Sequence, residues 1–382
     1  MQNVAQAWLV YRLTESSFML GLTAFFALFP VLLLGLWGGV LADHVNRHKL
    51  LVMAHTAGMI QALVLAVLTL SGIIEPWHII VLAAILGIIH ALEMPARHSF
   101  LSDMVSQEDI PNAIALNSSA FNIARFIGPF IAGILIAIFG EGPVFLINSL
   151  SFLAVIYGLL QMKLPPYVTR KNKVPALLKI REGLSFAWSN QAIRQSLMLL
   201  SVFSIVGTSL TVLMPVFTRM IFLGDSKILG ILLGSMGAGA LTGAFLLAYQ
   251  SRYKRLHWQI GVAGLVAGSC LVLFPMIKQL YFAIPILAVF GFCQTILAAS
   301  TNTLIQLRVP NAMRGRVMSV FSTVFIGFMP IGSLSSGFVA EQIGVMETVY
   351  MLGGFSLLAS ATFLIKTFSL TKNSNANEEQ SY

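Results

Sequence analysis

Charged residues are scarce in this chain. Aspartate, glutamate, lysine and arginine make up 10% of its 382 residues, whereas hydrophobic residues make up 57%. A soluble globular domain carries roughly a quarter charged residues, so this chain has too few to cover a water-soluble surface. Its net charge of +9 is dispersed along the sequence. That dispersal argues against nucleic-acid binding and is typical of the cytoplasmic loops of a membrane protein.

Cysteine pairs and nucleotide-binding motifs are also missing. The two cysteines, Cys270 and Cys293, lie in apolar stretches and have neither metal-site spacing nor the pattern of a disulfide framework. The phosphate-loop pattern G-x-x-x-x-G-K-S/T does not occur, which argues against ATP hydrolysis by this chain. The sequence therefore predicts no cofactor, no metal site and no enzymatic activity.

Long apolar stretches fill most of the sequence instead. A helix needs about 20 apolar residues to cross a bilayer. Eleven candidate spans cover residues 17–42, 49–73, 76–98, 112–140, 143–163, 192–221, 227–250, 257–276, 279–305, 312–341 and 346–369. Residues 1–13 are apolar but too few to cross, so we interpret them as the outer half of a helix 1 that is N-terminally truncated in a twelve-helix design. An interfacial segment before eleven spans is the alternative.

Basic residues and the longest polar connection define orientation and domains. Lysine and arginine concentrate on the side of the turn at 43–49, which predicts that this side faces the cytoplasm. Residues 165–190 separate an N-terminal helical half, 1–164, from a C-terminal helical half, 191–370. The polar tail, 371–382, is predicted to be disordered.

The connection between the halves contains one helical pattern. Its apolar side chains recur at helical spacing, at Leu177, Ile180, Leu184 and Trp188. This spacing predicts an amphipathic helix, which either lies on the inner leaflet or acts as a plain linker.

The two halves also resemble each other. Residues 110–133 can be laid on 309–332 without a gap, matching a Pro-Asn-Ala run and two glycines. Duplicated membrane halves are the architecture of secondary transporters, which bind their substrates between the repeats near the bilayer midplane.

The turn "GGVLADHVNRHKLL", residues 38–51, resembles the signature between helices 2 and 3 of the major facilitator superfamily, Gly-x-x-x-Asp-Arg-x-Gly-Arg-Arg/Lys. The resemblance extends over essentially the full chain. It implies an all-α membrane protein of the major facilitator fold, with two pseudo-symmetric six-helix halves. Here His44 replaces the usual basic residue and Asn46 the usual glycine. Because asparagine tolerates positive φ, the turn is expected to persist.

A narrower resemblance lies in residues 91–133, which look like the branch containing the enterobactin exporter and related multidrug exporters. The antiporter motif of helix 5 in that branch is G-x-x-x-G-P-x-x-G-G. Its positions are occupied here by Ala124, Gly128, Pro129, Ala132 and Gly133, so two of its glycines have become alanine. The resemblance implies an exporter.

The superfamily resemblance further implies a cytoplasmic gating latch. It would consist of Asp43, Arg47 and Glu93, with Asp43 facing the start of the helix that begins near Asn311. A carboxylate is favoured at the positive end of a helix dipole, and such a cluster would hold the halves together while the cavity opens outward. The alternative is an ordinary basic turn.

Two charged residues lie deep inside predicted spans. Glu93 is either a proton-coupling carboxylate or the local partner of Arg97, four residues later. Arg125 lies over a dozen residues into helix 5, where an unpaired arginine costs at least about 2.5–3.5 kcal/mol. It is either a structural arginine bonded to carbonyls and polar side chains, or a cavity residue that attracts an anionic or catechol-rich substrate.

These features predict a secondary active exporter of a small amphipathic molecule, drug-like or siderophore-like, that works by alternating access. Proton antiport is the expected driving force, because no nucleotide site occurs. The expected setting is the cytoplasmic (inner) membrane, with the chain as a multi-pass monomer whose partners are lipid, protons and the substrate, without nucleic acid. A non-transporting membrane sensor or scaffold on the same fold, and an uptake carrier, are the alternatives.

Overall fold

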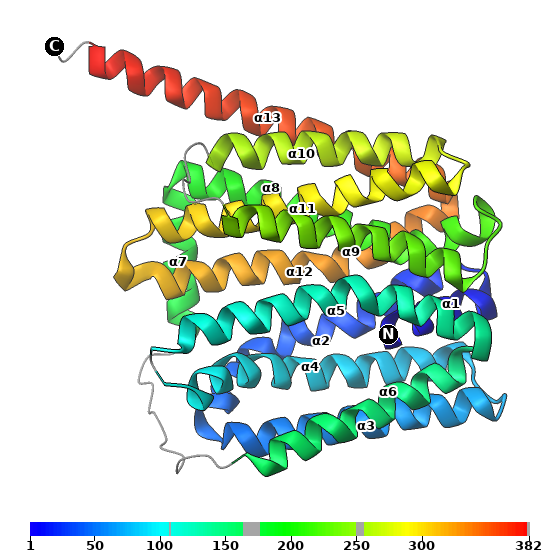
Figure 1. Cartoon of the computed structure of the whole chain (residues 1–382). Coiled ribbons are helices and arrows are strands. Elements are labelled where there is room, and N and C mark those ends of the chain that lie inside the picture. Colours follow the sequence, from blue (N-terminus) through cyan, green and yellow to red (C-terminus); the bar gives the residue numbers. More distant parts are fainter. Residues whose placement is uncertain (107, 163–175, 250–255, 380–382) are drawn as a thin grey trace.

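The computed structural model describes residues 1–106, 108–162, 176–249 and 256–379, and every regular element in these ranges is helical (Figure 1). Eleven of the described helices are long and apolar enough to cross a membrane. In chain order the elements are α1 (Gln2–Thr14), α2 (Ser17–His44), α3 (Arg47–Leu70), α4 (Pro76–Met104), α5 (Ile110–Phe139), α6 (Glu141–Gln161), α7 (Ala176–Ser189), α8 (Gln191–Met220), α9 (Ser226–Tyr249), α10 (Leu256–Leu273), the 3₁₀ turn η1 (Phe274–Met276), α11 (Leu280–Arg308), α12 (Asn311–Ile343) and α13 (Val345–Glu379).

The helices form two halves that repeat the same packing. In the first half α2 packs along α4 and α3 along α6; in the second, α9 packs along α11 and α10 along α13. The halves meet where α2 lies against α12 and where α5 lies against α9. The predicted all-helical membrane fold with two six-helix halves is confirmed, because each predicted span corresponds to one observed helix.

Helix α1 is short and is held by buried amides. It has 13 residues, whereas α8, the first helix of the second half, has 30. Gln2 of α1 donates a hydrogen bond to Gln61 of α3 at 2.9 Å, and Asn148 of α6 donates one to Gln2 at 2.7 Å. Such side-chain hydrogen bonds join helices in a bilayer. They fix α1 to its own half, with its first turn beside Gly128, midway along the bundle (Figure 1).

The turn between α2 and α3 is stabilised by a helix cap. The Oδ1 atom of Asn46 accepts a hydrogen bond from the backbone N–H of Lys49 at 3.2 Å. The φ angle of Asn46 is −59°, so the expectation that this residue adopts a positive φ is wrong. Asparagine suits this position because its side chain satisfies an otherwise unpaired N–H at the start of α3.

Helix α7 packs on α12 at the end of the bundle that the basic residues predict to face the cytoplasm, which we call the inner end; the opposite end is the outer end. Glu182 forms an ion pair with Arg316 at 2.6 Å, and Gly183 lies against the backbone of the same arginine. Leu184 and Trp188, from the predicted apolar stripe, remain 48% and 57% exposed. A stripe that the protein itself leaves uncovered favours the inner-leaflet interpretation, which stays a prediction. Leu177 and Ile180 lie outside the described side chains.

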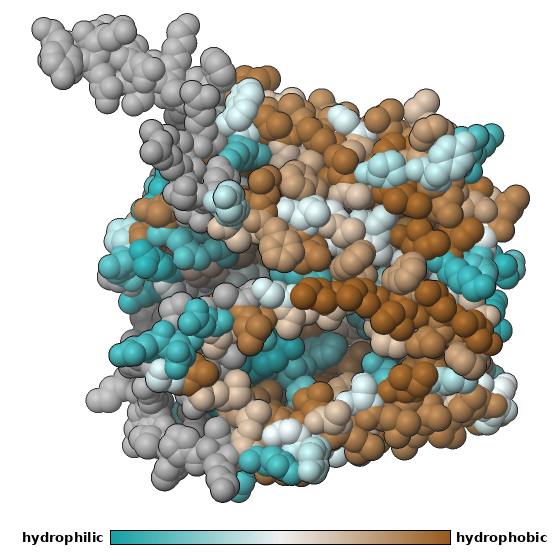
Figure 2. Space-filling model, in the orientation of Figure 1, coloured by the Kyte–Doolittle hydropathy of each residue, from teal (hydrophilic) through white to brown (hydrophobic). Residues whose placement is uncertain are grey.

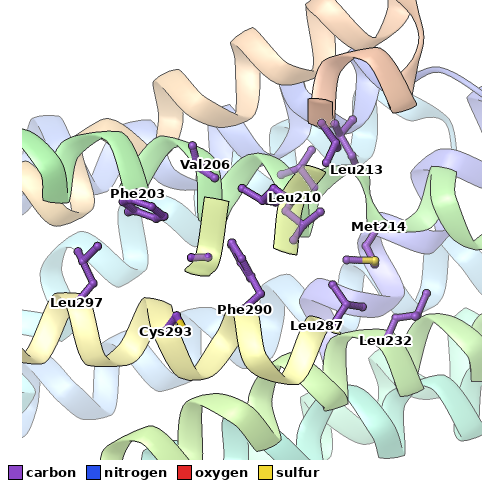
Figure 3. Close-up of a cluster of buried hydrophobic side chains, with 14 of the residues drawn as sticks. Phe203, Val206, Leu210, Leu213, Met214, Leu232, Leu287, Phe290, Cys293 and Leu297 are labelled. Carbon is purple, nitrogen blue, oxygen red and sulfur yellow. The ribbon is translucent and has the colours of Figure 1, made fainter. Parts of the chain in front are cut away.

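The most tightly packed core belongs to the C-terminal half. Figure 3 shows side chains of α8 and α11 pointing toward one another, with Leu232 of α9 beside them. Phe203, Leu210 and Phe290 are at most 1% exposed. The membrane-crossing window of α8 is 67% buried, whereas those of α2 and α5 are each 17% buried.

Helix α13 continues to Glu379 and projects past the inner end of the bundle, where α7 lies (Figure 1). This differs from the disorder that the polar composition of 371–382 predicts. The reason lies in the sequence of residues 355–379, which contains no glycine or proline. Polar residues weaken a helix, but only these two residue types break its backbone pattern directly.

Candidate functional site

The halves approach closely at two glycine crossings near the outer end of the bundle. In the first crossing, a Cβ atom on Gly21 of α2 would lie 2.9 Å from the Cα of Gly337 on α12. In the second, a Cβ on Gly133 of α5 would lie 2.8 Å from the Cα of Gly230 on α9. Separations below 3.0 Å essentially never occur for real Cβ atoms. Only glycine therefore permits either crossing, as at other close helix contacts in membranes.

The two crossings occupy equivalent places in the two halves. Gly21 and Gly230 each stand four residues after the start of their helix, at Ser17 and Ser226. On the other two helices, Gly133 stands six residues before Phe139, and the corresponding glycine of α12 stands six residues before Ile343. This equivalence is what a twofold relation between the halves requires.

The gapless overlay of α5 on α12 does not assign these roles correctly. It matches Gly133 with Gly332, but Gly332 packs on the backbone of Ile205 of α8, and Gly337 is the residue at the crossing. Helix α12 has 33 residues and α5 has 30. An alignment without gaps that starts at the inner ends therefore no longer matches equivalent positions at the outer ends.

Further contacts between the halves lie at the same outer end. Glu341 of α12 accepts hydrogen bonds from the Ser16 hydroxyl and from the backbone N–H of Phe18, both at 3.1 Å. The guanidinium of Arg219, at the end of α8, lies 5.6 Å from the ring centroid of Trp8 on α1. Each contact joins one half to the other, so the outer end is closed.

The inner ends of the crossing helices are uncovered. The contact face of α5 reaches inward as far as Phe126, which lies against Gly237 of α9. Farther toward the inner end, Leu116 of α5 is 74% exposed and Tyr249 of α9 is 92% exposed. Within the described ranges, the halves are therefore closed at the outer end and open at the inner end.

The predicted helix-5 motif lies on two faces of α5. Pro129 and Gly133 face α9 and form the crossing. Gly128 lies beside Met1, the N-cap residue of α1, and Ala132, one turn farther out, is 0% exposed. Ala124 is exposed one turn closer to the cytoplasm. The two glycine-to-alanine departures, at 124 and 132, fall on the face that does not cross α9, so they leave the crossing intact.

Arg125 lies on α5, one turn inward of Gly128. Helical spacing places it near Gly128 and Ala132, and its backbone carbonyl lies against Gly237 of α9. Its side chain is exposed, and within the described ranges no side chain forms a hydrogen bond or ion pair with it. Figure 2 shows a hollow between α5 and α4 with hydrophilic side chains inside it. An arginine at mid-depth is tolerated where it faces water, which fits this hollow.

The three residues of the predicted latch lie on three helices. Asp43 belongs to α2, but its side chain lies outside the described residues. Arg47 begins α3, and Glu93 is 8% exposed in the inner half of α4. Glu93 forms an ion pair with Arg97, with Oε1 3.5 Å from Nη1. The local pair expected as the alternative role of Glu93 is thus observed, and the latch stays a prediction.

Two histidines accompany the Glu93–Arg97 pair. His55 of α3 and His90 of α4 each lie within electrostatic range of both Glu93 and Arg97. On α3, His55 stands eight residues after the helix start, which is about 12 Å deeper. Sequence reasoning missed this cluster. The available signal was the spacing of His90, Glu93 and Arg97, which puts all three on one face of α4.

Other buried amides join helices. Gln6 donates to the carbonyl of Ile79 at 3.3 Å, and Gln294 donates to the carbonyl of Phe203 at 3.3 Å. No group of three or more histidine, cysteine, aspartate or glutamate side chains that could hold a metal ion occurs in the described part of the chain.

The closed outer crossings, the repeated halves and the recess have the geometry of a membrane transporter. Residues 1–382 match the family described as "transmembrane secretion effector", within the major facilitator superfamily. The chain belongs to this family. Membership in the superfamily confirms the resemblance found in the turn at residues 38–51 and in α5.

Characterised relatives of this secretion effector are transporters. It is 27% identical to the staphyloferrin A transporter of Staphylococcus aureus, over 93% of this chain and 89% of the relative. It is 24% identical to the multidrug efflux pump Tap of Mycolicibacterium fortuitum, over 91% and 87%. A Na⁺, Li⁺, K⁺/H⁺ antiporter of Planococcus maritimus is 23% identical over 90% and 86%.

A solved structure supports the fold. This chain superimposes on a crystal structure of a mutant of the nucleoside transporter NupG with a TM-score of 0.73. The sequence identity is 15%, and the match covers 95% of this chain and 94% of the NupG chain. At this level of identity the likeness shows the major facilitator fold and leaves the cargo open.

Proposed function

We propose that this secretion effector exports a small amphipathic molecule, drug-like or siderophore-like, across the cytoplasmic membrane by alternating access in exchange for protons. The observation that carries the proposal is the closed outer end formed by two equivalent glycine crossings, with an exposed Arg125 farther inward on α5. The names of two relatives, a siderophore transporter and a multidrug efflux pump, support export of this substrate class.

Transport requires the halves to exchange which end is closed. In the outward-open form, the crossings at Gly21 and Gly133 separate and the cytoplasmic ends come together. The predicted latch of Asp43, Arg47 and Glu93 would hold the cytoplasmic ends in that form, because a carboxylate is stabilised at the start of a facing helix. Coupling then follows only if the substrate and the proton bind the two forms with different affinities.

Arg125 gives the recess a positive charge. A guanidinium pairs with carboxylates through two parallel hydrogen bonds, and its charge is weakly screened inside a protein. We therefore assign Arg125 a substrate-binding role that favours anionic or catechol-rich cargo over cationic cargo. A structural role is disfavoured because the described side chains leave it without a partner.

Flux measurements in proteoliposomes test the proposal. The full chain is reconstituted and efflux of staphyloferrin A, erythromycin and ethidium is followed with and without a pH gradient. Faster efflux of at least one compound with an inward-directed proton gradient is expected. Absence of flux for all three from correctly inserted protein would favour a sensor or scaffold, and accumulation driven in the uptake direction would favour an importer.

Variants at Arg125 test the substrate assignment. Arg125→Gln should lower anionic efflux by roughly tenfold, the equivalent of about 1.4 kcal/mol, with little effect on ethidium. Arg125→Lys should retain part of the activity because it keeps the charge but not the planar fork. Arg181→Gln, on an exposed position of α7, is the matched control. Unchanged efflux of the anion by Arg125→Gln removes the assigned role.

A further inference from the structure

Helix α7 crosses the inner end of the bundle instead of running along the other helices (Figure 1). It begins at Ala176 and ends at Ser189, and the next residue begins the connection to α8. The Oδ1 atom of that residue, Asn190, caps α8 by accepting a hydrogen bond from the backbone N–H of Ile193 at 3.2 Å. Helix α8 is long and apolar enough to cross the membrane. A helix that turns away from α8 at its inner end therefore lies at the level of the lipid headgroups.

One face of α7 is fixed to α12. Glu182 forms the 2.6 Å ion pair with Arg316, and Gly183 lies so close to the carbonyl of that arginine that a Cβ would not fit. Ala187, one turn after Gly183, is buried. Because residues three and four apart share a helix face, these contacts leave the opposite face of α7 directed away from the bundle.

The outward face of α7 is apolar at its centre. Leu184 and Trp188 stand one turn apart on this face, and both are exposed. Exposure of two large apolar side chains to water is unfavourable, whereas tryptophan is enriched where a bilayer meets water. An amphipathic helix of this kind buries its apolar face at the boundary between headgroups and acyl chains. The outward face of α7 thus fits a lipid surface.

The first turn of α8 places a guanidinium over the Trp188 ring. The Cζ atom of Arg194 lies 5.9 Å from the centroid of that ring, and its Nη1 atom donates a hydrogen bond to the Trp188 carbonyl at 3.2 Å. These two contacts hold the planar fork beside the apolar face. Within the described ranges no other nitrogen of this guanidinium has a hydrogen-bond partner, so its remaining N–H groups are left for an acceptor. A guanidinium binds phosphate through two parallel hydrogen bonds.

The charge around this guanidinium is positive. Helix α8 contains no aspartate or glutamate, and the single acid of α7, Glu182, is paired with Arg316. Arg181 shares the outward face of α7 but stands seven residues before Trp188, which is about 10 Å along the helix. No acid of either helix thus competes with an anionic ligand for Arg194.

We propose that Leu184, Trp188 and Arg194 form a binding site for one anionic phospholipid of the leaflet at the inner end. Arg194 binds the lipid phosphate, the Trp188 ring packs on the glycerol region, and Leu184 contacts the start of an acyl chain. A headgroup with a net negative charge, as in phosphatidylglycerol, is favoured because the ammonium group of a zwitterionic lipid would lie near a guanidinium of the same charge. The site depends neither on the cargo nor on the proposed function.

Thermal unfolding of the full chain in detergent tests the site, because a ligand that binds the folded form raises the melting temperature. Dioleoyl phosphatidylglycerol should raise the melting temperature further than the same concentration of dioleoyl phosphatidylcholine. Inorganic phosphate should leave it unchanged, because it lacks the glycerol and acyl chains that Trp188 and Leu184 contact. An equal rise with both lipids, or the full rise with phosphate alone, overturns the proposal.

Variants at the site separate its parts. Arg194→Gln should weaken the apparent affinity for phosphatidylglycerol roughly tenfold, because the charge-assisted hydrogen bonds to the phosphate are lost. Arg194→Lys should lose less affinity, because it keeps the charge but not the planar fork. Trp188→Leu keeps an apolar side chain but removes the ring that supports Arg194, so it should also weaken binding. Unchanged affinity in Arg194→Gln removes the site.

Arg181→Gln is the matched control for the charge. It removes a guanidinium from the same face of α7, two turns away from Trp188, and should keep the affinity for phosphatidylglycerol. Equal losses in Arg181→Gln and Arg194→Gln would mean that the overall positive charge attracts the lipid without a site at Arg194. That result would overturn the proposal.

Fluorescence quenching locates the lipid contact on α7. Leu184→Cys, made with Cys270→Ala and Cys293→Ala, carries a bimane label in phosphatidylglycerol liposomes. Lipid brominated near its carbonyl groups should quench the label more than lipid brominated at the chain ends. If neither lipid quenches it, water or another part of the chain covers this face, and the proposal is wrong. No cargo enters these measurements, so lipid binding without transport would contradict only the proposed function.

Discussion

The two halves of this secretion effector share a fold but differ in how they are packed. In the C-terminal half, α8 has 30 residues and its membrane window is 67% buried, whereas in the N-terminal half α1 has 13 residues and the window of α5 is 17% buried. The charged groups at mid-depth, Glu93 and Arg125, both lie in the looser half. From this contrast we expect the C-terminal half to be the more rigid platform, and we propose that the N-terminal half carries the moving and binding parts.

The largest effect is expected where the two halves touch. Gly133→Leu puts a side chain into a contact where even a Cβ would lie 2.8 Å from Gly230. The outer end can then no longer close, so the transport rate should fall at least about tenfold. This corresponds to a rise of about 1.4 kcal/mol in the activation free energy. Flux in proteoliposomes measures this loss.

The matched control for that change is Gly354→Leu. Gly354 lies on α13 with nothing near its Cβ position, so the added side chain has room. Its transport and thermal stability should stay near those of the unmodified protein. Equal loss of transport in both variants would mean that leucine on these helices is harmful in itself, and the crossing would lose its assigned role.

The difference in packing predicts that the same substitution lowers the free energy of unfolding by different amounts in the two halves. Phe290→Ala in the C-terminal core, where the ring is 1% exposed, should lower the free energy of unfolding by about 3–5 kcal/mol. Phe130→Ala on α5, where the ring is 46% exposed, should lower it by less than about 1 kcal/mol. Unfolding in mixed micelles measures both. Similar values for the two variants would contradict the rigid-platform account.

A smaller effect is expected from the amides that hold α1. Gln61→Leu removes the acceptor of Gln2 and should cost roughly 1 kcal/mol, in line with hydrogen bonds between membrane helices. Hydrogen exchange should then rise in α1. Gln294→Leu in the C-terminal half removes only a bond to the carbonyl of Phe203 and should leave exchange in α1 unchanged. If both variants free α1 equally, the amides do not anchor it locally.

Much of the fold could be predicted from the sequence because hydrophobicity and helix length are local properties. Eleven apolar stretches each became one helix. The tail was the exception: its polarity predicted disorder, while the absence of helix-breaking residues lets α13 run to Glu379. The turn at Asn46 was predicted correctly, but from the tolerance of asparagine for positive φ. In the structure its φ is negative, and its side chain caps α3 instead.

The candidate site was harder to predict because it depends on pairing between distant helices. The motif glycine Gly133 was identified, but its partner Gly230 and the equivalent pair Gly21 and Gly337 were not. Nothing in a single sequence says which glycines of different helices will touch. The histidines around Glu93 were missed for the same reason, because His55 lies on another helix, 38 positions away.

Accessibility of α5 from either side of the membrane tests the central claim most directly. Ala124 is exposed one turn inward of Gly128, so Ala124→Cys, made with Cys270→Ala and Cys293→Ala, reports which end is open. The account predicts that a membrane-impermeant maleimide labels this cysteine from the cytoplasmic side at rest, and from the outer side as well while a substrate is being exported. Labelling restricted to the cytoplasmic side under both conditions, or equal labelling from both sides at rest, would contradict it.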